Sequence, residues 1–225
     1  MTSQPQSGGP PGQASQEPRP PERTTFSDVF SLYFERALGT RDKSRPPASG
    51  AAEAAWAFLG CCCGIGAVAA LHFFAAQPAA LTLLTPAFAA SAVLLYGAPA
   101  APLAQPRNVV LGHLGSALLG VVLRLLLVAL PPWPAASAPA RGGAELLAGT
   151  LAVALSTALM MLGGVAHPPG AATALLAVVG GEAITSLGFL YVPLVTVSAV
   201  LMVAVAVIVN NFSALPTRRY PAFKW

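Results

Sequence analysis

Long apolar runs, separated by short breaks, fill the chain from residue 53 onward. At about 1.5 Å of rise per residue, a helix needs roughly 20 apolar residues to cross the hydrocarbon layer of a bilayer. The runs that approach or exceed this length are 54–76, 107–130, 145–163 and 188–210. The pattern therefore predicts at least four membrane-spanning helices.

Two further apolar runs, 81–96 and 171–180, are shorter and lie beside prolines. If both cross as short or broken helices, the chain has six segments. If both are re-entrant loops, it crosses four times. We expect six segments, because 81–98 is just long enough to cross.

The two short runs resemble each other. Aligning "TPAFAASAVLLYGA", which begins at Thr85, with "HPPGAATALLAVVG", which begins at His167, places Pro86 opposite Pro168 and Ser91 opposite Thr173. Each short run also follows a long run and precedes another. This order favours a duplicated three-segment unit, with repeats 54–130 and 145–211.

Composition supports an all-α polytopic membrane protein. The chain is 55% hydrophobic and 9% charged, with a mean hydropathy of +0.67, whereas soluble domains carry roughly 25% charged residues. Lys and Arg concentrate near the two ends, which favours the cytoplasmic side for both termini and an even number of crossings. With six crossings the two units are inverted, and with four they are parallel. No basic and aromatic interleaving indicates a nucleic-acid partner, so the expected partner surface is the lipid bilayer.

The segments outside the apolar core have different compositions. Residues 1–24 are rich in Pro and Gly and are expected to be disordered. Residues 25–52 contain an amphipathic pattern and a basic linker, which fits either an interfacial helix or a helix packed under the bundle. The membrane domain is expected at 53–211, followed by a basic C-terminal tail at 212–225.

The prolines at 168 and 169 have a mechanical consequence. Proline breaks a helix that runs through it and suits the first turn of a new one. The long helix should stop near Gly163, and a short helix should start near Pro169. The amides of Gly170 and Ala171 would then be free to meet an anion at the positive end of the helix dipole, and Pro86 would create a similar start.

Several side chains near these starts are candidates for binding. His167 can donate to an anion or carry a proton, or it is simply bonded to a backbone carbonyl. The hydroxyls of Ser91 and Thr173 either face a substrate or bond back to their own helices. Arg107, beside Asn108, either attracts an anion or snorkels to the interface. The candidate substrate-binding residues are therefore His167, Pro168, Pro169, Gly170, Ala171, Thr173, Pro86, Ser91, Arg107 and Asn108.

The run "HPPGAATAL", together with "QPRNVVLGH" from Gln105 to His113, resembles the HPP family of integral membrane proteins. The resemblance covers about 56–211. It implies a small multi-pass protein, and because plant plastid members are associated with nitrite transport, it implies nitrite as one substrate. The chain departs from the family pattern at 85–88, where a more Gly-rich stretch is expected, and in its long N-terminal segment.

We therefore expect a transporter or channel-like carrier for a small inorganic anion, with the substrate at the starts of the two short helices. The alternative is a non-transporting membrane scaffold or assembly protein in which the HPP turn is structural. An enzyme is not expected, because the apolar core shows no carboxylate pair, nucleophile with a base, or metal spacing, and no cofactor or metal is implied. A homo-oligomer would help so small a bundle to shield its site.

Overall fold

The computed structural model describes residues 48–75, 84–129 and 138–223. In these ranges all regular structure is helical, which confirms the all-α class. The expected disordered segment 1–24 and the amphipathic helix expected within 25–52 lie outside the described residues, apart from the last few positions of the linker.

Within the described residues, four helices are long and apolar enough to cross a membrane. They are α2 (Ala51–Ala75), α4 (Pro106–Arg124, continued by the π-helical turn Leu125–Ala129), α5 (Ala138–Leu162) and α8 (Tyr191–Phe212, preceded by the 3-10 turn Gly188–Leu190). Three of the four begin within a few residues of the predicted runs. The exception is α5, which begins at 138 rather than 145 although its first turns carry Arg141 and two glycines. An ion pair between Arg141 and Glu145, one turn apart, stabilises this polar start.

Two short helices complete the bundle. These are α3 (Pro86–Ala92, continued by the π-helical turn Val93–Gly97) and α6 (Pro168–Val179), and a single turn, α7 (Glu182–Thr185), follows α6. Both short helices have a proline at their first position and an N-cap residue in extended conformation, Thr85 in α3 and His167 in α6. The aligned residues of the two sequence runs thus occupy equivalent places in the two helices.

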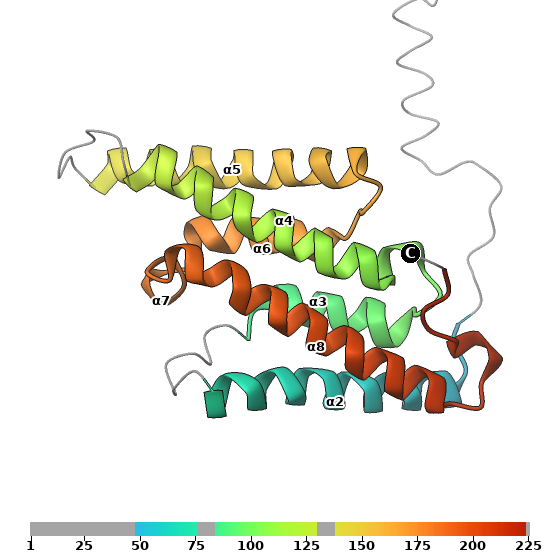
Figure 1. Ribbon diagram of the computed structural model, residues 1–225. Helices are drawn as coiled ribbons and strands as arrows, with labels where there is room; N and C mark the ends of the chain where they lie inside the picture. Colours follow the sequence, from blue (N-terminus) through green and yellow to red (C-terminus); the bar gives the residue numbers. More distant parts are fainter. Residues whose placement is uncertain (1–47, 76–83, 130–137, 224–225) are drawn as a thin grey trace, which may run out of the picture. The chain divides into compact units, whose positions relative to one another are not determined.

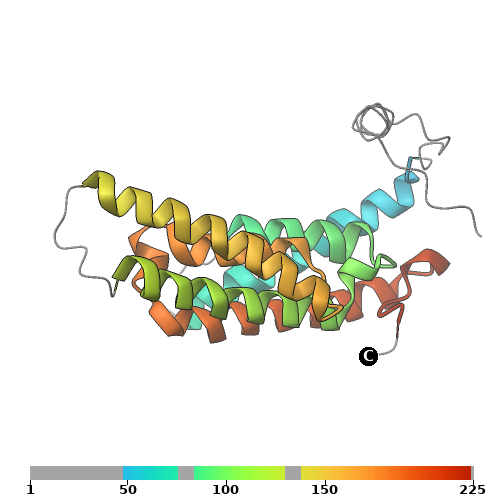
Figure 2. The same ribbon diagram turned by 90° about the horizontal axis from the view of Figure 1, so that it is seen from above.

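The helices form an antiparallel bundle (Figures 1 and 2), in which each of α2, α3, α4, α5, α6 and α8 runs opposite to the one before it. Helix α6 packs between α4 and α5, and α3 packs against α2 and α6. The long helices pair as α2 with α8 and α5 with α4, while α4 and α8 also contact each other. Each short helix therefore packs against the long helices on one side and keeps an exposed face, at Val93 in one case and Val179 in the other.

Small residues allow these close contacts. A Cβ added to Gly120 of α4 would lie 2.4 Å from the carbonyl oxygen of Ala174, and one added to Gly64 of α2 would overlap the ring of Tyr96. Large apolar side chains instead point outward, with Phe58, Phe74 and others strongly exposed. A bundle with small residues inside and large apolar residues outside is typical of a protein surrounded by lipid.

Candidate functional site

The break between α5 and α6 is built from two glycines and two prolines. Gly164 has a positive φ of 62°, and the amide of Val165 donates to the carbonyl of Met160 at 2.9 Å, which is a Schellman ending. The chain then reaches α6, which begins at Pro168, one residue before the predicted start. The predicted stop near Gly163 is confirmed.

The start of α6 does not leave the amide of Gly170 free. Pro168 and Pro169 have no amide hydrogen, and the amide of Gly170 donates to the carbonyl of His167 at 2.8 Å. Gly170 also faces α4 so closely that an added Cβ would lie 2.7 Å from the carbonyl oxygen of Gly112. The prediction of a free Gly170 amide is therefore wrong, because the prolines remove two donors and the first remaining one closes a turn.

Instead, four buried side chains from α3, α4 and α6 form a hydrogen-bonded chain, which we call the histidine network. Its members are Ser91, His113, His167 and Thr173, and none is more than 1% exposed. Ser91 Oγ lies 2.8 Å from His113 Nε2 and 2.9 Å from His167 Nε2. His113 Nδ1 lies 2.8 Å from Thr173 Oγ1, and His167 Nδ1 lies 2.8 Å from the carbonyl oxygen of Leu103.

The partners fix the direction of these bonds when both rings are neutral. The carbonyl of Leu103 can only accept, so His167 donates to it from Nδ1 and accepts at Nε2 from the Ser91 hydroxyl. Ser91 then accepts from His113 Nε2–H, which leaves His113 Nδ1 to accept from the hydroxyl of Thr173. Every bond in the chain is satisfied, and all point toward Leu103.

The opposite end of the histidine network has a second acceptor. The Thr173 hydroxyl also lies 3.3 Å from the carbonyl oxygen of Pro169, one turn earlier in α6. If that hydroxyl turns to Pro169, His113 can carry a proton on both ring nitrogens without losing a partner. The rings of His113 and His167 are 5.0 Å apart between centroids, so repulsion between two imidazolium rings would disfavour a second added proton.

The structure therefore brings together three of the predicted site residues, Ser91, Thr173 and His167. Both hydroxyls belong to the network, and the Thr173 hydroxyl has the carbonyl of Pro169 in its own helix as an alternative acceptor. Pro169 and Gly170 are buried beside them, Ala171 is half-buried, and Pro86 and Pro168 are exposed at the helix starts.

Arg107 and Asn108 lie at the start of α4, apart from the histidine network. Arg107 is exposed and donates to the carbonyl of Gly163 at 3.2 Å, and Asn108 donates to that of Ala166 at 2.9 Å. Both side chains hold the α5–α6 turn. They also line a cavity of about 170 Å³ at this end of the bundle, with Gln105 and Phe223 among its other walls.

A second buried polar group surrounds Arg218, within the segment expected to be a basic tail. The Arg218 side chain is 1% exposed, and its guanidinium donates to the Glu53 carboxylate at 3.0 Å and to Asn210 Oδ1 at 2.9 Å. It also donates to the carbonyl of Tyr96. This Arg218 cluster fixes the chain after α8 to the start of α2.

Tyr220 also holds the chain after α8 on the bundle. Burial raises the pKa of its phenol, which stays protonated and donates to the carbonyl of Ala104 at 2.8 Å. The amide of Ala222 donates to Gln105 Oε1 at 2.9 Å. Residues 213–223 are thus docked on the bundle end that carries Gln105.

His113 is not among the candidate binding residues predicted from the sequence, and Arg218 falls in the predicted basic tail. His113 lies seven positions after Pro106 on a helix of small and apolar residues, and this isolated polar residue in a span was the available signal. For Arg218 the local sequence gives no such signal, because its partner Glu53 is 165 positions away.

Comparisons with known proteins agree with this architecture. The family model described as "HPP, transmembrane region" matches residues 46–221. Two Dictyostelium discoideum proteins, both named as transmembrane proteins, are 39% identical over 194 residues and 38% identical over 197 residues. These alignments cover 86% and 87% of this chain but only 63% and 58% of the relatives' lengths. No solved structure gives a significant match. Because the family model covers most of the chain, the protein belongs to the HPP transmembrane-region family.

Proposed function

We propose that this protein is a small permease for an inorganic anion, and that the histidine network is the site where the anion and a proton are handled. The observation that carries the proposal is the burial of two histidines and two hydroxyls in one hydrogen-bonded chain between the short helices. Polar side chains inside a membrane are costly and commonly mark the path of an ion or substrate. Nitrite is the substrate that the family resemblance suggests.

The order of the helices supports this proposal. We interpret α2, α3 and α4 as one unit and α5, α6 and α8 as a second, inverted unit, which gives six segments and places both termini on the cytoplasmic side. Ser91 and Thr173 are the sixth residues of α3 and α6, so the two units contribute equivalent hydroxyls to one network. Transporters built from inverted repeats bind their substrates where broken helices of the two repeats meet.

The proposed mechanism depends on hydroxyl groups that can rotate. An anion that reaches Ser91 and Thr173 finds hydroxyls that can turn their protons from the histidines toward it, and an imidazole N–H that already donates. A proton taken up by His113 or His167 would neutralise the anion's charge during the crossing. Moving such a pair costs far less than moving a bare anion through a medium of low dielectric constant.

A structural role for the network is the second candidate. The four side chains are fully packed, and hydrogen bonds between membrane helices are worth up to about 2 kcal/mol each. In that case the histidines serve only to hold α3, α4 and α6 together, and the protein is a scaffold. The two candidates differ in whether the wild-type protein carries an anion flux that depends on the histidines.

Anion uptake into proteoliposomes tests the proposal. Wild-type protein should take up nitrite faster than liposomes without protein, and uptake should acidify the lumen if a proton accompanies the anion. His167→Ala protein, reconstituted at equal amounts of folded protein, should lose this uptake. Equal uptake by both proteins, or none by the wild type, would exclude the proposed function.

A further inference from the structure

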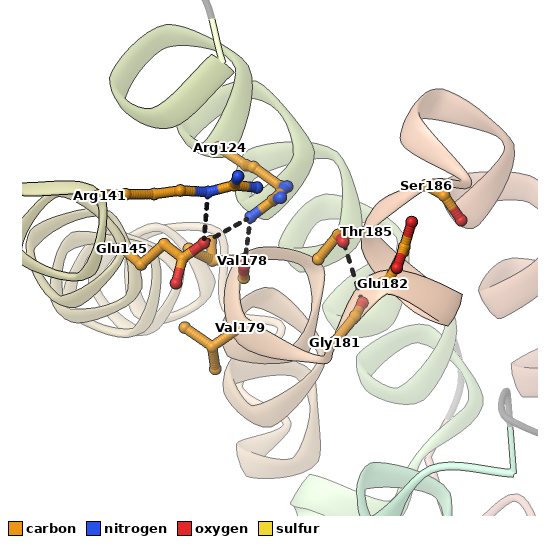
Figure 3. A pocket seen from close by; sticks show the side chains of 9 residues that line it. All are labelled: Arg124, Arg141, Glu145, Val178, Val179, Gly181, Glu182, Thr185 and Ser186. Atoms are coloured by element: carbon orange, nitrogen blue, oxygen red, sulfur yellow. Dashed lines mark hydrogen bonds and ion pairs between the residues drawn. The ribbon is translucent and has the colours of Figure 1, made fainter. Parts of the chain in front are cut away.

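A cavity lies at the end of the bundle opposite Arg107, where α4 ends and α5 begins. Its volume is about 460 Å³. It is lined by the end of α4, the start of α5, the end of α6 and the turn α7 (Figure 3). The lining side chains that carry charge are Arg124, Arg141, Glu145 and Glu182.

Two guanidinium groups in this cavity share one carboxylate. Arg124 Nη1 lies 3.7 Å and Arg141 Nε lies 3.6 Å from Glu145 Oε1. Figure 3 shows both arginines pointing toward Glu145, while Glu182 lies on the far side of the cavity beside Thr185. Positive charge therefore exceeds negative charge on the Arg124 side.

Two nitrogens of the Arg124 guanidinium are available as hydrogen-bond donors to a ligand. Its Nη1 also donates to the carbonyl of Val178 at 2.7 Å, which holds the side chain in place and leaves it only 16% exposed. Among the residues that the structure describes, Nε and Nη2 of Arg124 have no acceptor. Planar guanidinium donors of this kind bind the paired oxygens of small oxyanions well.

The same arginine borders a second cavity that leads inward. This cavity, of about 180 Å³, shares Arg124 and Thr185 with the first and reaches Tyr191 of α8. Tyr191 is buried, and its hydroxyl donates to the backbone carbonyl of Thr173 at 3.2 Å. The inner cavity thus reaches Tyr191, whose hydroxyl bonds the backbone of Thr173, the residue at one end of the histidine network.

We propose that the cavity around Arg124 and Arg141 is a loading site for a small inorganic oxyanion, and that Glu145 is a built-in competitor which the anion displaces. The inference rests on the proposed transport function, because the loading site would supply the anion that the histidine network handles. An anion that replaces Glu145 gains both guanidinium groups. It is then held at the wall shared by the two cavities.

Binding to the full chain in detergent tests the site without any flux. Thermal unfolding midpoints are measured as sodium nitrite replaces sodium gluconate at constant ionic strength, since a ligand that binds the folded state raises the midpoint in a saturable way. Wild-type protein should show saturable stabilisation. Glu145→Gln should bind nitrite about threefold to fivefold more tightly, the size expected for releasing a partly exposed ion pair.

Glu182→Gln is the matched control, because it makes the same charge change in the same cavity without breaking an ion pair in the described structure. It should tighten binding by less than about twofold. Arg141→Gln, which alters an exposed side chain, and Arg124→Gln should each weaken binding at least about tenfold. Equal effects of the two Glu variants, or unchanged binding in Arg141→Gln, would overturn the loading site.

Other results separate this inference from the proposed function. If wild-type protein transports nitrite but shows no saturable binding, or is stabilised by phosphatidic acid and not by nitrite, the loading site is wrong and transport stands. If binding follows the predicted order of variants but no uptake occurs, the anion site stands and the permease does not.

Discussion

The Arg218 cluster and the histidine network are both buried polar groups, but they differ in charge and in the number of hydrogen-bonded arrangements that they can adopt. Arg218 is a permanent cation that is matched by Glu53 and by fixed carbonyls at one end of the bundle. The histidine network is neutral in the arrangement described, and the Thr173 hydroxyl has two acceptors to choose from. The Arg218 side chain has one arrangement of hydrogen bonds, in which only its Nε is unpaired, and this suits a group that holds the fold. The histidine network has two arrangements, which suits a group that handles a proton or an anion.

This contrast predicts that changes in the two regions affect different measurements. Removing Arg218 should mainly lower stability. Changing the histidine network should mainly lower flux, with a smaller cost in stability.

Arg218→Met should cause the largest loss of stability. It leaves the buried Tyr96 carbonyl and Asn210 Oδ1 without their donor, at about 1–3 kcal/mol each, and the partly exposed Glu53 carboxylate without its cation. Thermal unfolding in detergent measures the effect. Arg219→Met, which changes an exposed neighbour, should shift the midpoint little. Similar midpoints for the two variants would show that the cluster does not hold the fold.

Gly112→Ala should lower both the stability of the protein and its anion uptake. The new Cβ would lie 2.8 Å from His167 Cβ, so the histidine must move or α4 must shift, at a cost of about 1–3 kcal/mol. Uptake should fall with it, because His167 loses its position. Gly115→Ala on the same helix is the control, since nothing lies within 4 Å of its added Cβ. If both variants transport as the wild type does, the position of His167 is not critical.

Thr173→Val should separate flux from stability most cleanly within the network. The change keeps the shape and removes the hydroxyl that bonds His113, at a cost of about 1 kcal/mol in the free energy of unfolding. Uptake should fall several-fold, and Thr173→Ser should restore it. Thr196→Val removes a hydroxyl that bonds only its own helix and should leave uptake unchanged. Failure of Thr173→Ser to restore uptake would count against a role for the hydroxyl.

Arg107→Gln should have the smallest effect. Its guanidinium is exposed, bonds one carbonyl, and does not contact the histidine network. We expect less than about a threefold change in uptake, and a smaller change at high salt, where exposed charges are screened. Uptake measured at low and high ionic strength tests this, and complete loss of uptake would place Arg107 in the path itself.

The helices were predictable from sequence because the signals for them are local. Runs of apolar residues set the four long helices, and Gly164 and Pro168 set the break before α6. The resemblance of the two short runs also led to Ser91 and Thr173, which share one network. These inferences needed no knowledge of distant contacts.

The rest of the site depends on packing between distant segments. His113 becomes central only because its ring reaches Ser91 of α3 and Thr173 of α6, and Arg218 is buried only because the chain after α8 returns to Glu53. The supposed free amide of Gly170 failed for a local reason: after two prolines, its amide is the first donor available to the carbonyl of His167. The pairings of His113 and Arg218 with distant residues leave no signal in the hydropathy pattern.

A comparison of two buried histidines is the most direct test that the histidine network handles the anion. His113 belongs to the network, whereas His72 of α2 lies 2.9 Å from Ser198 Oγ of α8 and forms a separate pair. Nitrite uptake should be measured for His113→Gln and His72→Gln at equal amounts of folded protein. The account predicts at least a tenfold loss for His113→Gln and nearly unchanged uptake for His72→Gln. Equal uptake by the two variants would contradict it.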